Sequence, residues 1–281
     1  MKQKDISFAI DLIRNEGWGH TRVDLERMLS LSPKGSYVWE TAGERHGFVT
    51  SIRYENTAMI GHLLVTSESR GRNVGKSLLS TLLDDIDSSG VQSTMLYATN
   101  EGSGLYRQFG FEESGLELSA IGILVKEGDR SEIETACTGI NEEDLADIAS
   151  NDRKIFGDDR SELMTRLFRE FPEHSFKAEN AGHISGYILG RRTPIGFDIG
   201  PWFCSSGRKD SANLLNSAIR SFPCGGRIDL SSFASNSDVP RIIARYHRYR
   251  RTESVKLMIR GERRYATDVN HVLGVAGFEL G

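Results

Sequence analysis

A short basic turn between an expected strand and an expected helix holds the residues best suited to chemistry. Arg70, Arg72 and Lys76 lie within seven residues, with glycines at positions 71 and 75. The first backbone N–H groups of a helix have no partner inside the helix, and the helix dipole is positive at that end. Because three cations lie at the same end, the turn could cradle an anion such as a pyrophosphate. A purely structural cap would not require these charges.

The elements around this turn predict a mixed α/β fold. The apolar run AMIGHLLV at 58–65 is typical of a strand, and leucines at 78–83 recur at helical spacing. Thr21 or Asp24 could cap a short helix that ends near Leu29. The expected elements of the first half are helix 6–14, that short helix, strands 37–40, 47–54 and 57–65, helix 74–88, strand 91–99 and helix 102–109.

The second half repeats a similar order of elements, which suggests an internal duplication. The polar stretch KEGDRSEIETACTGIN at 126–141 is expected to join the halves. We predict an α/β protein of two domains, 1–126 and 141–281, joined by a linker at 127–140. The expected elements of the second half are helices 144–149 and 161–171, strands 174–179, 182–191 and 195–203, helix 211–221, strand 226–230, a basic helix 240–251 and strand 254–259.

Length and composition also fit two globular domains. The 281 residues exceed the roughly 100–200 of one domain, and 38% hydrophobic and 26% charged residues are ordinary fractions. No run approaches the roughly 20 apolar residues that a membrane-spanning helix needs. Cys137, Cys204 and Cys224 lack the spacing of metal ligands. We therefore expect a cytoplasmic protein with no metal ion and no membrane partner.

The cluster RIIARYHRYRR at 241–251 is the one stretch that could favour a nucleic-acid partner. Its arginines could neutralise phosphates, and Tyr246 and Tyr249 could stack on bases. Helical spacing would equally place Ile242, Ile243 and both tyrosines on one apolar face, with arginines around the rest. Because the net charge of the chain is −4, we interpret the cluster as a solvated helix face and expect no nucleic-acid partner.

Two stretches of the first half resemble the GCN5-related N-acetyltransferase superfamily. Residues 65–75 match its acetyl-CoA-binding pattern Arg-x-x-Gly-x-Gly through Arg70 and Gly75, with Asn73 at the first glycine. Residues 96–111, LYATNEGSGLYRQFGF, match its strand and helix that end in Leu-Tyr-x-x-Phe/Leu-Gly-Phe. Asparagine tolerates positive φ, so the turn can keep its shape at residue 73.

The rest of the chain resembles a two-domain bacterial branch of that superfamily. The matching stretches are Glu16-Gly17-Trp18, FGDDR from Phe156, IGPW from Ile199 and the final VLGVAGFELG. The resemblance implies two tandem acetyltransferase-like domains, each with a mixed, mostly antiparallel sheet flanked by helices. The second domain has SSGRKDSANLL where the Arg-x-x-Gly-x-Gly pattern would be. We expect it to bind no acetyl-CoA and to shape the acceptor site or the oligomer.

The resemblance implies acetyl-CoA as a co-substrate and places its parts along the first domain. Backbone groups of the strand before the turn would contact the pantetheine and thioester, and the turn itself would hold the pyrophosphate. After the next strand, Thr99 or Asn100 would reach the pantetheine arm. The implied cofactor-binding residues are Leu63, Leu64, Val65, Arg70, Gly71, Arg72, Asn73, Val74, Gly75, Lys76, Thr99 and Asn100.

Acetyl transfer to an amine also needs a proton donor and a proton acceptor. Tyr106 matches the family's tyrosine that can protonate the leaving thiolate, and a phenol with a pKa near 10 suits that role; alternatively it is a core aromatic. His62 on the strand and Glu55 in the turn before it are candidate bases. His62 could equally be a core histidine and Glu55 a solvated turn residue, with ordered water as the base.

Two tryptophans are candidates for the acceptor side. The loop that holds Trp18 usually edges the acceptor site in this family, and Trp202 could face the same cleft from the second half; each could instead be a hydrophobic anchor. We predict an N-acetyltransferase, monomeric or homodimeric, for a small-molecule amine such as an amino acid, a polyamine or an aminoglycoside-like compound. The alternatives are a protein lysine or N-terminal acetyltransferase and a non-catalytic acyl-CoA sensor.

Overall fold

The computed structural model describes residues 1–126, 137–223, 226–251, 254–262 and 269–281. The chain divides into two units, and each unit is made of segments that are not contiguous in the sequence. Unit 1 holds Met1–Gly115 together with residues 256–262 and Phe278–Gly281, and unit 2 holds Leu116–Val255 and residues 269–277. The predicted linker lies outside the described residues at 127–136.

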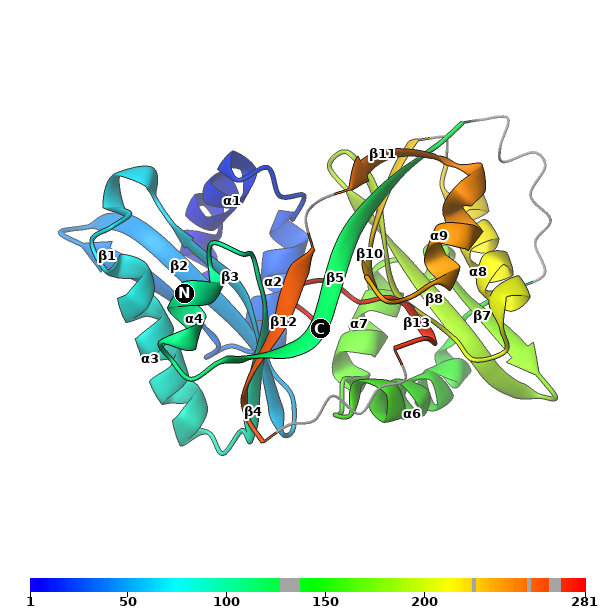
Figure 1. The fold of residues 1–281 in the computed structure, drawn as a ribbon, viewed down its shortest axis with the longest axis horizontal. Coiled ribbons are helices and arrows are strands. Elements are labelled where there is room, and N and C mark those ends of the chain that lie inside the picture. Colours follow the sequence, from blue (N-terminus) through cyan, green and yellow to red (C-terminus); the bar gives the residue numbers. More distant parts are fainter. Residues whose placement is uncertain (127–136, 224–225, 252–253, 263–268) are drawn as a thin grey trace. The chain divides into compact units, whose positions relative to one another are not determined.

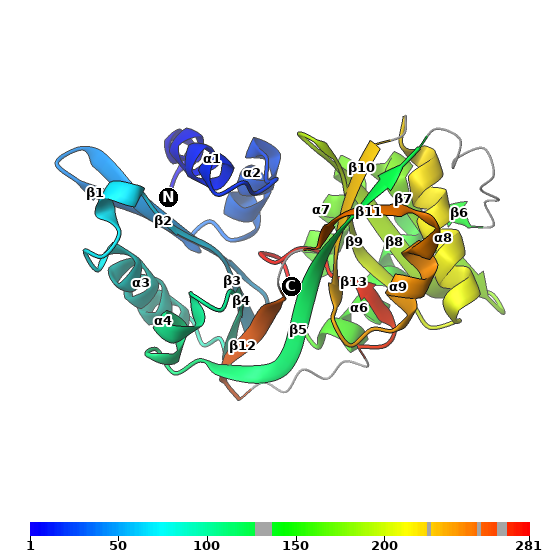
Figure 2. The same ribbon diagram turned by 45° about the horizontal axis from the view of Figure 1, so that its top comes forward.

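Unit 1 is a mixed sheet with helices on both faces, α1 and α2 on one and α3 and α4 on the other (Figure 2). Its strands follow the order β1-β2-β3-β4-β12, in which β3 and β4 are parallel and the other neighbours are antiparallel. The predicted helices and strands of this unit are confirmed within a few residues. They are α1 (Ile6–Asn15), α2 (Arg22–Leu31), β1 (Ser36–Thr41), β2 (Glu44–Arg53), β3 (Thr57–Val65), α3 (Val74–Ser88), β4 (Ser93–Ala98), α4 (Ser103–Arg107) and β12 (Val255–Gly261).

Local signals explain where the helices of unit 1 begin and which faces they bury. Thr21 and Asp24 form a capping box at α2, because each side chain accepts a hydrogen bond from the backbone N–H of the other residue, at 3.3 Å and 2.7 Å. Helix α3 buries the predicted apolar face, and each such side chain contributes roughly 1.5–3 kcal/mol when fully buried. The buried residues of α3 are Val74, Leu78, Leu79, Leu82, Leu83 and Ile86.

The parallel strands β3 and β4 part before either one ends. Their pairing runs from Thr57 opposite Ser93 to Ile60 opposite Leu96. Strand β3 nevertheless continues to Val65, and it stays paired with β2 on its other side as far as that residue. The stretch 61–65 therefore has one edge that is not paired with β4.

The strands of unit 2 follow the order β5-β10-β9-β8-β7-β6, with β11 on β5 and β13 on β9. The helices of unit 2 form two neighbouring pairs, α6 with α7 and α8 with α9 (Figure 1). The pair β9 and β10 is parallel. The elements are β5 (Glu112–Val125, which begins in unit 1), β6 (Thr138–Gly139), α6 (Leu145–Phe156), α7 (Ser161–Glu170), β7 (Ser175–Asn180), β8 (His183–Thr193), β9 (Gly196–Cys204), α8 (Arg208–Ser221), β10 (Gly226–Phe233), α9 (Asp238–Ile242), β11 (His247–Arg251) and β13 (Val272–Gly274).

The prediction of one basic helix over 240–251 is wrong. Helix α9 ends at Ile242, and His247–Arg251 form β11, which pairs with β5 in antiparallel fashion. The apolar residues at helical spacing are buried as far as Tyr246. Beyond it the backbone pairs with the edge of β5, which satisfies main-chain groups of both strands. The side chains from residue 249 to 251 lie outside the described part of the chain.

Strand β12 joins the sheet of unit 1 although it follows β11 in the sequence. Lys256 lies opposite Ala98 and Gly261 opposite Ser93 of β4. The Arg260 guanidinium binds both carboxylate oxygens of Asp87 on α3, at 2.6 Å and 2.8 Å. The predicted second domain, 141–281, contains β12. In the structure, however, all of β12 except its first residue, Val255, belongs to unit 1. Across the described ranges, no helix is long and apolar enough to cross a membrane.

Candidate active site

The basic turn has the backbone shape expected of an anion site at a helix start. Gly71 has φ +76° and Asn73 has φ +62°, so both are left-handed, and α3 begins at the next residue. This confirms that asparagine can replace glycine at position 73. Its side chain makes no capping hydrogen bond. The backbone N–H groups of residues 74–76 make no hydrogen bond with described residues, so they can receive a ligand.

The fold itself does not require a glycine at position 75. A Cβ there would meet a methyl group of Val65 at 3.5 Å, which is an ordinary contact. At Gly47, by contrast, a Cβ would come within 2.7 Å of the Leu64 carbonyl oxygen. Glycine in a helix costs roughly 0.5–1 kcal/mol relative to alanine. Its presence in the first turn of α3 therefore suits a ligand that approaches the backbone closely.

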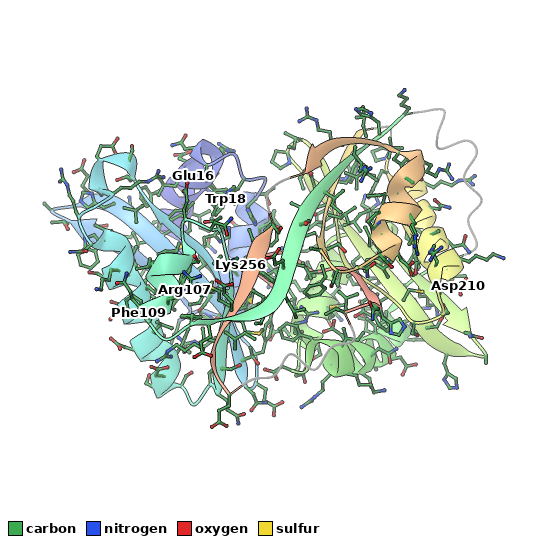
Figure 3. The ribbon with its side chains drawn as sticks, in the orientation of Figure 1. Glu16, Trp18, Arg107, Phe109, Asp210 and Lys256 are labelled. Atoms are coloured by element: carbon green, nitrogen blue, oxygen red, sulfur yellow. The ribbon has the colours of Figure 1, made fainter. Side chains whose placement is uncertain are left out.

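The cations of the turn are exposed, and one of them connects it to the loop after α1. Arg70 donates from Nε to the Val65 carbonyl oxygen at 3.2 Å, and its guanidinium pairs with the Glu16 carboxylate. Arg72 and Lys76 form no ion pair with described residues. Figure 3 labels Glu16 and Trp18 in the loop that follows α1. An exposed ion pair of this kind contributes at most about 1 kcal/mol.

Strand β3 leads directly into this turn. Leu64 is buried, and Leu63 and Val65 are half-buried. These three residues lie in the part of β3 whose edge is not paired with β4. Backbone groups on an unpaired strand edge can bind an extended ligand as a further strand would. The open edge and the basic turn are thus continuous.

Thr99 and Asn100, in the loop after β4, differ in the hydrogen bonds of their side chains. The Thr99 Oγ1 accepts a hydrogen bond from the Gly102 N–H at 3.1 Å, so this side chain helps to form the turn into α4. The Asn100 carbonyl oxygen accepts a bond from the Ser103 hydroxyl at 2.9 Å. The Asn100 side chain is exposed and makes no hydrogen bond with described residues. Its amide can therefore take a ligand without breaking the turn.

Tyr106 lies on α4 and packs into the core of unit 1. Its ring meets the ring of Phe111 edge to face, with 6.0 Å between centroids. Burial raises the pKa of Tyr106 to about 12. The phenol therefore keeps its proton at any pH near neutrality. It can donate a hydrogen bond to developing negative charge, and it cannot act as a base there.

His62 is a fully buried member of a cluster of rings. Its Nδ1 lies 3.0 Å from the Thr50 Oγ1, which also accepts the backbone N–H of His62. Burial, and then the neighbouring His20, lower the pKa of His62 to about 3. The ring is therefore neutral near pH 7. A general base works best when its pKa is close to the operating pH, and the pKa of His62 is well below it. His62 is thus a weak candidate for the base.

The other candidate base, Glu55, is exposed in the turn between β2 and β3. Seven residues of extended chain separate it from His62, which corresponds to a distance on the order of 20 Å. The basic turn follows the opposite end of β3. The structure therefore does not bring Glu55 together with His62 or with the turn.

Trp18 lies beside His20, which the sequence analysis missed, and His20 lies next to a second missed residue, Glu279. The Trp18 ring is 5.9 Å from that of His62, and the His20 and His62 rings meet edge to face at 4.5 Å. The His20 Nε2 lies 3.1 Å from the Glu279 Oε2. His20 and Glu279 come from opposite ends of the sequence, and the only signal for His20 was its place near Trp18.

Trp202 belongs to unit 2, where it is 0% exposed in the centre of the core. An indole in this position packs a core and has no surface to offer an acceptor. The structure supports the interpretation of Trp202 as a hydrophobic anchor.

In unit 2 the chain itself fills the place between the two parallel strands. The pairing of β9 with β10 ends at Ile199 opposite Leu230, and β13 then pairs with β9. The Val275 N–H donates to the Ser231 carbonyl oxygen on β10 at 2.9 Å. The Asn236 amide donates to the carbonyl oxygen of Val272 at 3.0 Å. A segment of the protein thus bridges the strands where they part.

No group of three or more His, Cys, Asp or Glu side chains is placed to hold a metal ion within the described ranges. Cys137 and Cys204 are free thiols, and Cys224 lies outside those ranges.

Both halves of the chain match family models described as an acetyltransferase (GNAT) domain, over residues 12–126 and 148–274. The chain belongs to the GNAT acetyltransferase family and carries two such domains in tandem. It is therefore an acyltransferase.

The relatives agree with this assignment. The uncharacterized N-acetyltransferase YitH of Bacillus subtilis (strain 168) is 26% identical over 201 residues, which cover 72% of this chain and 70% of YitH. A putative acetyltransferase from Pyrococcus horikoshii superposes with a TM-score of 0.80 at 20% identity, over 100% of this chain and 94% of that one. A tandem GNAT protein from the clavulanic acid biosynthesis pathway has a TM-score of 0.60 at 14% identity, over 92% and 95%. At these identities the solved structures show the fold alone.

Proposed function

We propose that unit 1 transfers the acetyl group of acetyl-CoA to the primary amine of a small molecule. One observation carries this proposal: an unpaired strand edge, a left-handed basic turn and an uncapped helix start follow one another within residues 61–76. GNAT proteins in general use acetyl-CoA, and this sequence of features suits a ligand with an extended arm and a pyrophosphate.

The parts of the ligand would be held as follows. The N–H groups of residues 74–76 would bind the pyrophosphate, with Arg72 and Lys76 adding charge. The backbone of 63–65 would hold the pantetheine arm. Of the two residues after β4, we assign Asn100 to that arm, because the Thr99 hydroxyl already serves the turn.

The reaction then needs an attack by a neutral amine on the thioester carbonyl carbon. As the carbon–sulfur bond breaks, negative charge develops on the sulfur of CoA. Tyr106 stays protonated and donates a hydrogen bond to that sulfur as the charge appears. The exposed Trp18 offers an aromatic face on the acceptor side, and such a face attracts an ammonium group.

Binding and turnover test the proposal together. Acetyl-CoA is titrated into the full chain by calorimetry, and CoA release is followed by a thiol reagent with amino acids, polyamines, aminoglycosides and lysine peptides as acceptors. We expect saturable binding and acetylation of at least one small amine. Failure of both acetyl-CoA and CoA to bind at millimolar concentration would overturn the proposal. Binding without any turnover would favour an acyl-CoA sensor.

The same titration should give a stoichiometry of about one acetyl-CoA per chain. Unit 2 also has a GNAT domain, but β13 and Asn236 occupy the place where its parallel strands part. No Arg-x-x-Gly-x-Gly pattern precedes α8 either. Two equivalent sites per chain would contradict this assignment.

A further inference from the structure

Residues 278–281 lie at the place in unit 1 where β3 and β4 separate. Gly61 and Tyr97 are the first residues of the two strands beyond their paired stretch, and we call this place the fork. A Cβ on Gly61 would come within 2.6 Å of the Glu279 Cβ, and the Phe278 ring lies 5.7 Å from that of Tyr97. Two consecutive residues of this segment therefore lie against the two sides of the fork.

The segment 278–281 is tied to its surroundings in unit 1 by polar contacts. The Tyr54 hydroxyl donates a hydrogen bond to the Leu280 carbonyl oxygen at 2.6 Å, and the Glu279 Oε2 lies 3.1 Å from the His20 Nε2. Both Glu279 and Leu280 are buried. A ligand could displace this segment only by breaking these contacts, so the segment sets a fixed boundary at the fork.

Phe278 keeps accessible surface at this boundary. All other residues from 272 to 281 are buried, whereas Phe278 is half-buried, and so is Tyr97. The planes of the two rings are inclined by 59° to each other. A phenyl ring has no hydrogen-bonding group, so Phe278 can offer a ligand apolar contact and a steric limit.

The proposed ligand would reach the fork with the end that reacts. Gly75 at the start of α3 is next to Val65, because a Cβ there would be 3.5 Å from a Val65 methyl group. From Val65 back to Gly61 the strand covers roughly 13 Å. The arm of CoA has about thirteen bonds between its phosphorus and its sulfur, which span on the order of 15 Å when extended. The sulfur and the acyl group bonded to it would therefore lie at the fork.

We propose that Phe278 limits the length of the acyl group, so that unit 1 transfers acetyl groups and rejects longer straight-chain acyl groups. This inference rests on the proposed acetyl transfer and specifies its donor. An acetyl group places one methyl group beyond the thioester carbonyl. Each further methylene has to enter the space that the Phe278 and Tyr97 rings occupy. One added methylene changes kcat/KM by about 10- to 200-fold in an apolar site.

The test varies the acyl group in the full chain, with the best amine of the panel as acceptor. We measure kcat/KM for acetyl-, propionyl-, butyryl- and hexanoyl-CoA in the wild type, Phe278→Ala, Phe278→Leu and the control Trp39→Ala. Trp39 is another half-buried aromatic of unit 1, but it lies on β1, which β2 separates from β3. The affinity for free CoA, which has no acyl group, and urea unfolding are measured for each protein.

We expect the wild type to use butyryl-CoA at least about 100-fold less well than acetyl-CoA. Phe278→Ala should bring the two donors to within about tenfold of each other, because loss of the ring leaves room for two more methylenes. Phe278→Leu should give an intermediate ratio, and it serves as the test if Phe278→Ala does not fold. The affinity for free CoA should not change, and Trp39→Ala should keep the wild-type ratio.

Three results would overturn the inference. They are a wild type that uses butyryl-CoA as well as acetyl-CoA, Phe278 variants that keep the wild-type ratio, and Phe278 variants that change only the ranking of the amines. The last would place Phe278 on the acceptor side. If the wild type binds acetyl-CoA without turnover, the same ratios are taken from equilibrium affinities. A wild type that binds neither acetyl-CoA nor CoA overturns the proposed function and, with it, this inference.

Discussion

Replacing Gly75 with valine is expected to remove acetyl-CoA binding while unit 1 stays folded. A Cβ at this position would meet a Val65 methyl group at 3.5 Å, which is an ordinary contact. It would, however, project from the first turn of α3, where phosphate oxygens must come within about 2.9 Å of the backbone nitrogens. We expect the dissociation constant to rise at least about 100-fold, which is about 2.7 kcal/mol.

The free energy of unfolding should change little, or it should rise while the affinity for acetyl-CoA falls. Gly75→Ala removes the backbone entropy of glycine, so the free energy of unfolding should rise by up to about 1 kcal/mol while affinity still falls. Urea unfolding and calorimetry measure the two quantities on the same samples. Gly226→Ala is the control, because a Cβ there would meet nothing within 4 Å and the residue lies in unit 2. If Gly75→Val leaves the affinity for acetyl-CoA unchanged, the pyrophosphate does not bind at this turn.

Replacing Tyr106 with phenylalanine is expected to lower kcat by about 10²- to 10⁴-fold with little change in the KM for acetyl-CoA. The ring and its contact with Phe111 remain, so only the hydrogen bond to the leaving sulfur is lost. Because burial raises the pKa of Tyr106 to about 12, its proton is retained throughout pH 6–10. Deprotonation of Tyr106 should therefore not lower the wild-type rate in that pH range.

Tyr37→Phe provides the control for this prediction. Tyr37 is a phenol of the same unit, and burial, followed by a hydrogen bond with Asp85, raises its pKa. Removing this hydroxyl should leave kcat unchanged. If Tyr106→Phe also keeps the wild-type kcat, Tyr106 has no part in the chemistry and is a core aromatic.

Features that depend on neighbouring residues were predictable from the sequence. Helix α3 matches its predicted bounds because its apolar spacing and the turn before it are contained in one stretch. The left-handed turn at Asn73 followed from the conformations open to asparagine. The family resemblance implied that backbone groups of β3 contact the pantetheine, but the open edge of β3 was not predicted, because periodicity says nothing of where two paired strands separate.

Features that depend on pairing between distant segments were not predictable. The basic segment after Ile242 fitted a helix by its spacing, yet the edge of β5 draws it into β11. In the same way, no local signal marks Glu279 as a neighbour of His20, or β13 as the segment between β9 and β10. These contacts depend on how the whole chain folds.

The position of β12 has a consequence for how the protein is made. On the ribosome, all of β1 to β4 and the basic turn emerge before most of unit 2 has been synthesised. Strand β4 then has an unpaired edge until Lys256–Gly261 emerge and reach it. Exposed strand edges invite wrong pairing, and contacts between segments so distant in sequence form slowly. The unit that holds the basic turn in one continuous stretch is thus among the last parts of the protein to be completed, and its maturation depends on synthesis of nearly the entire chain.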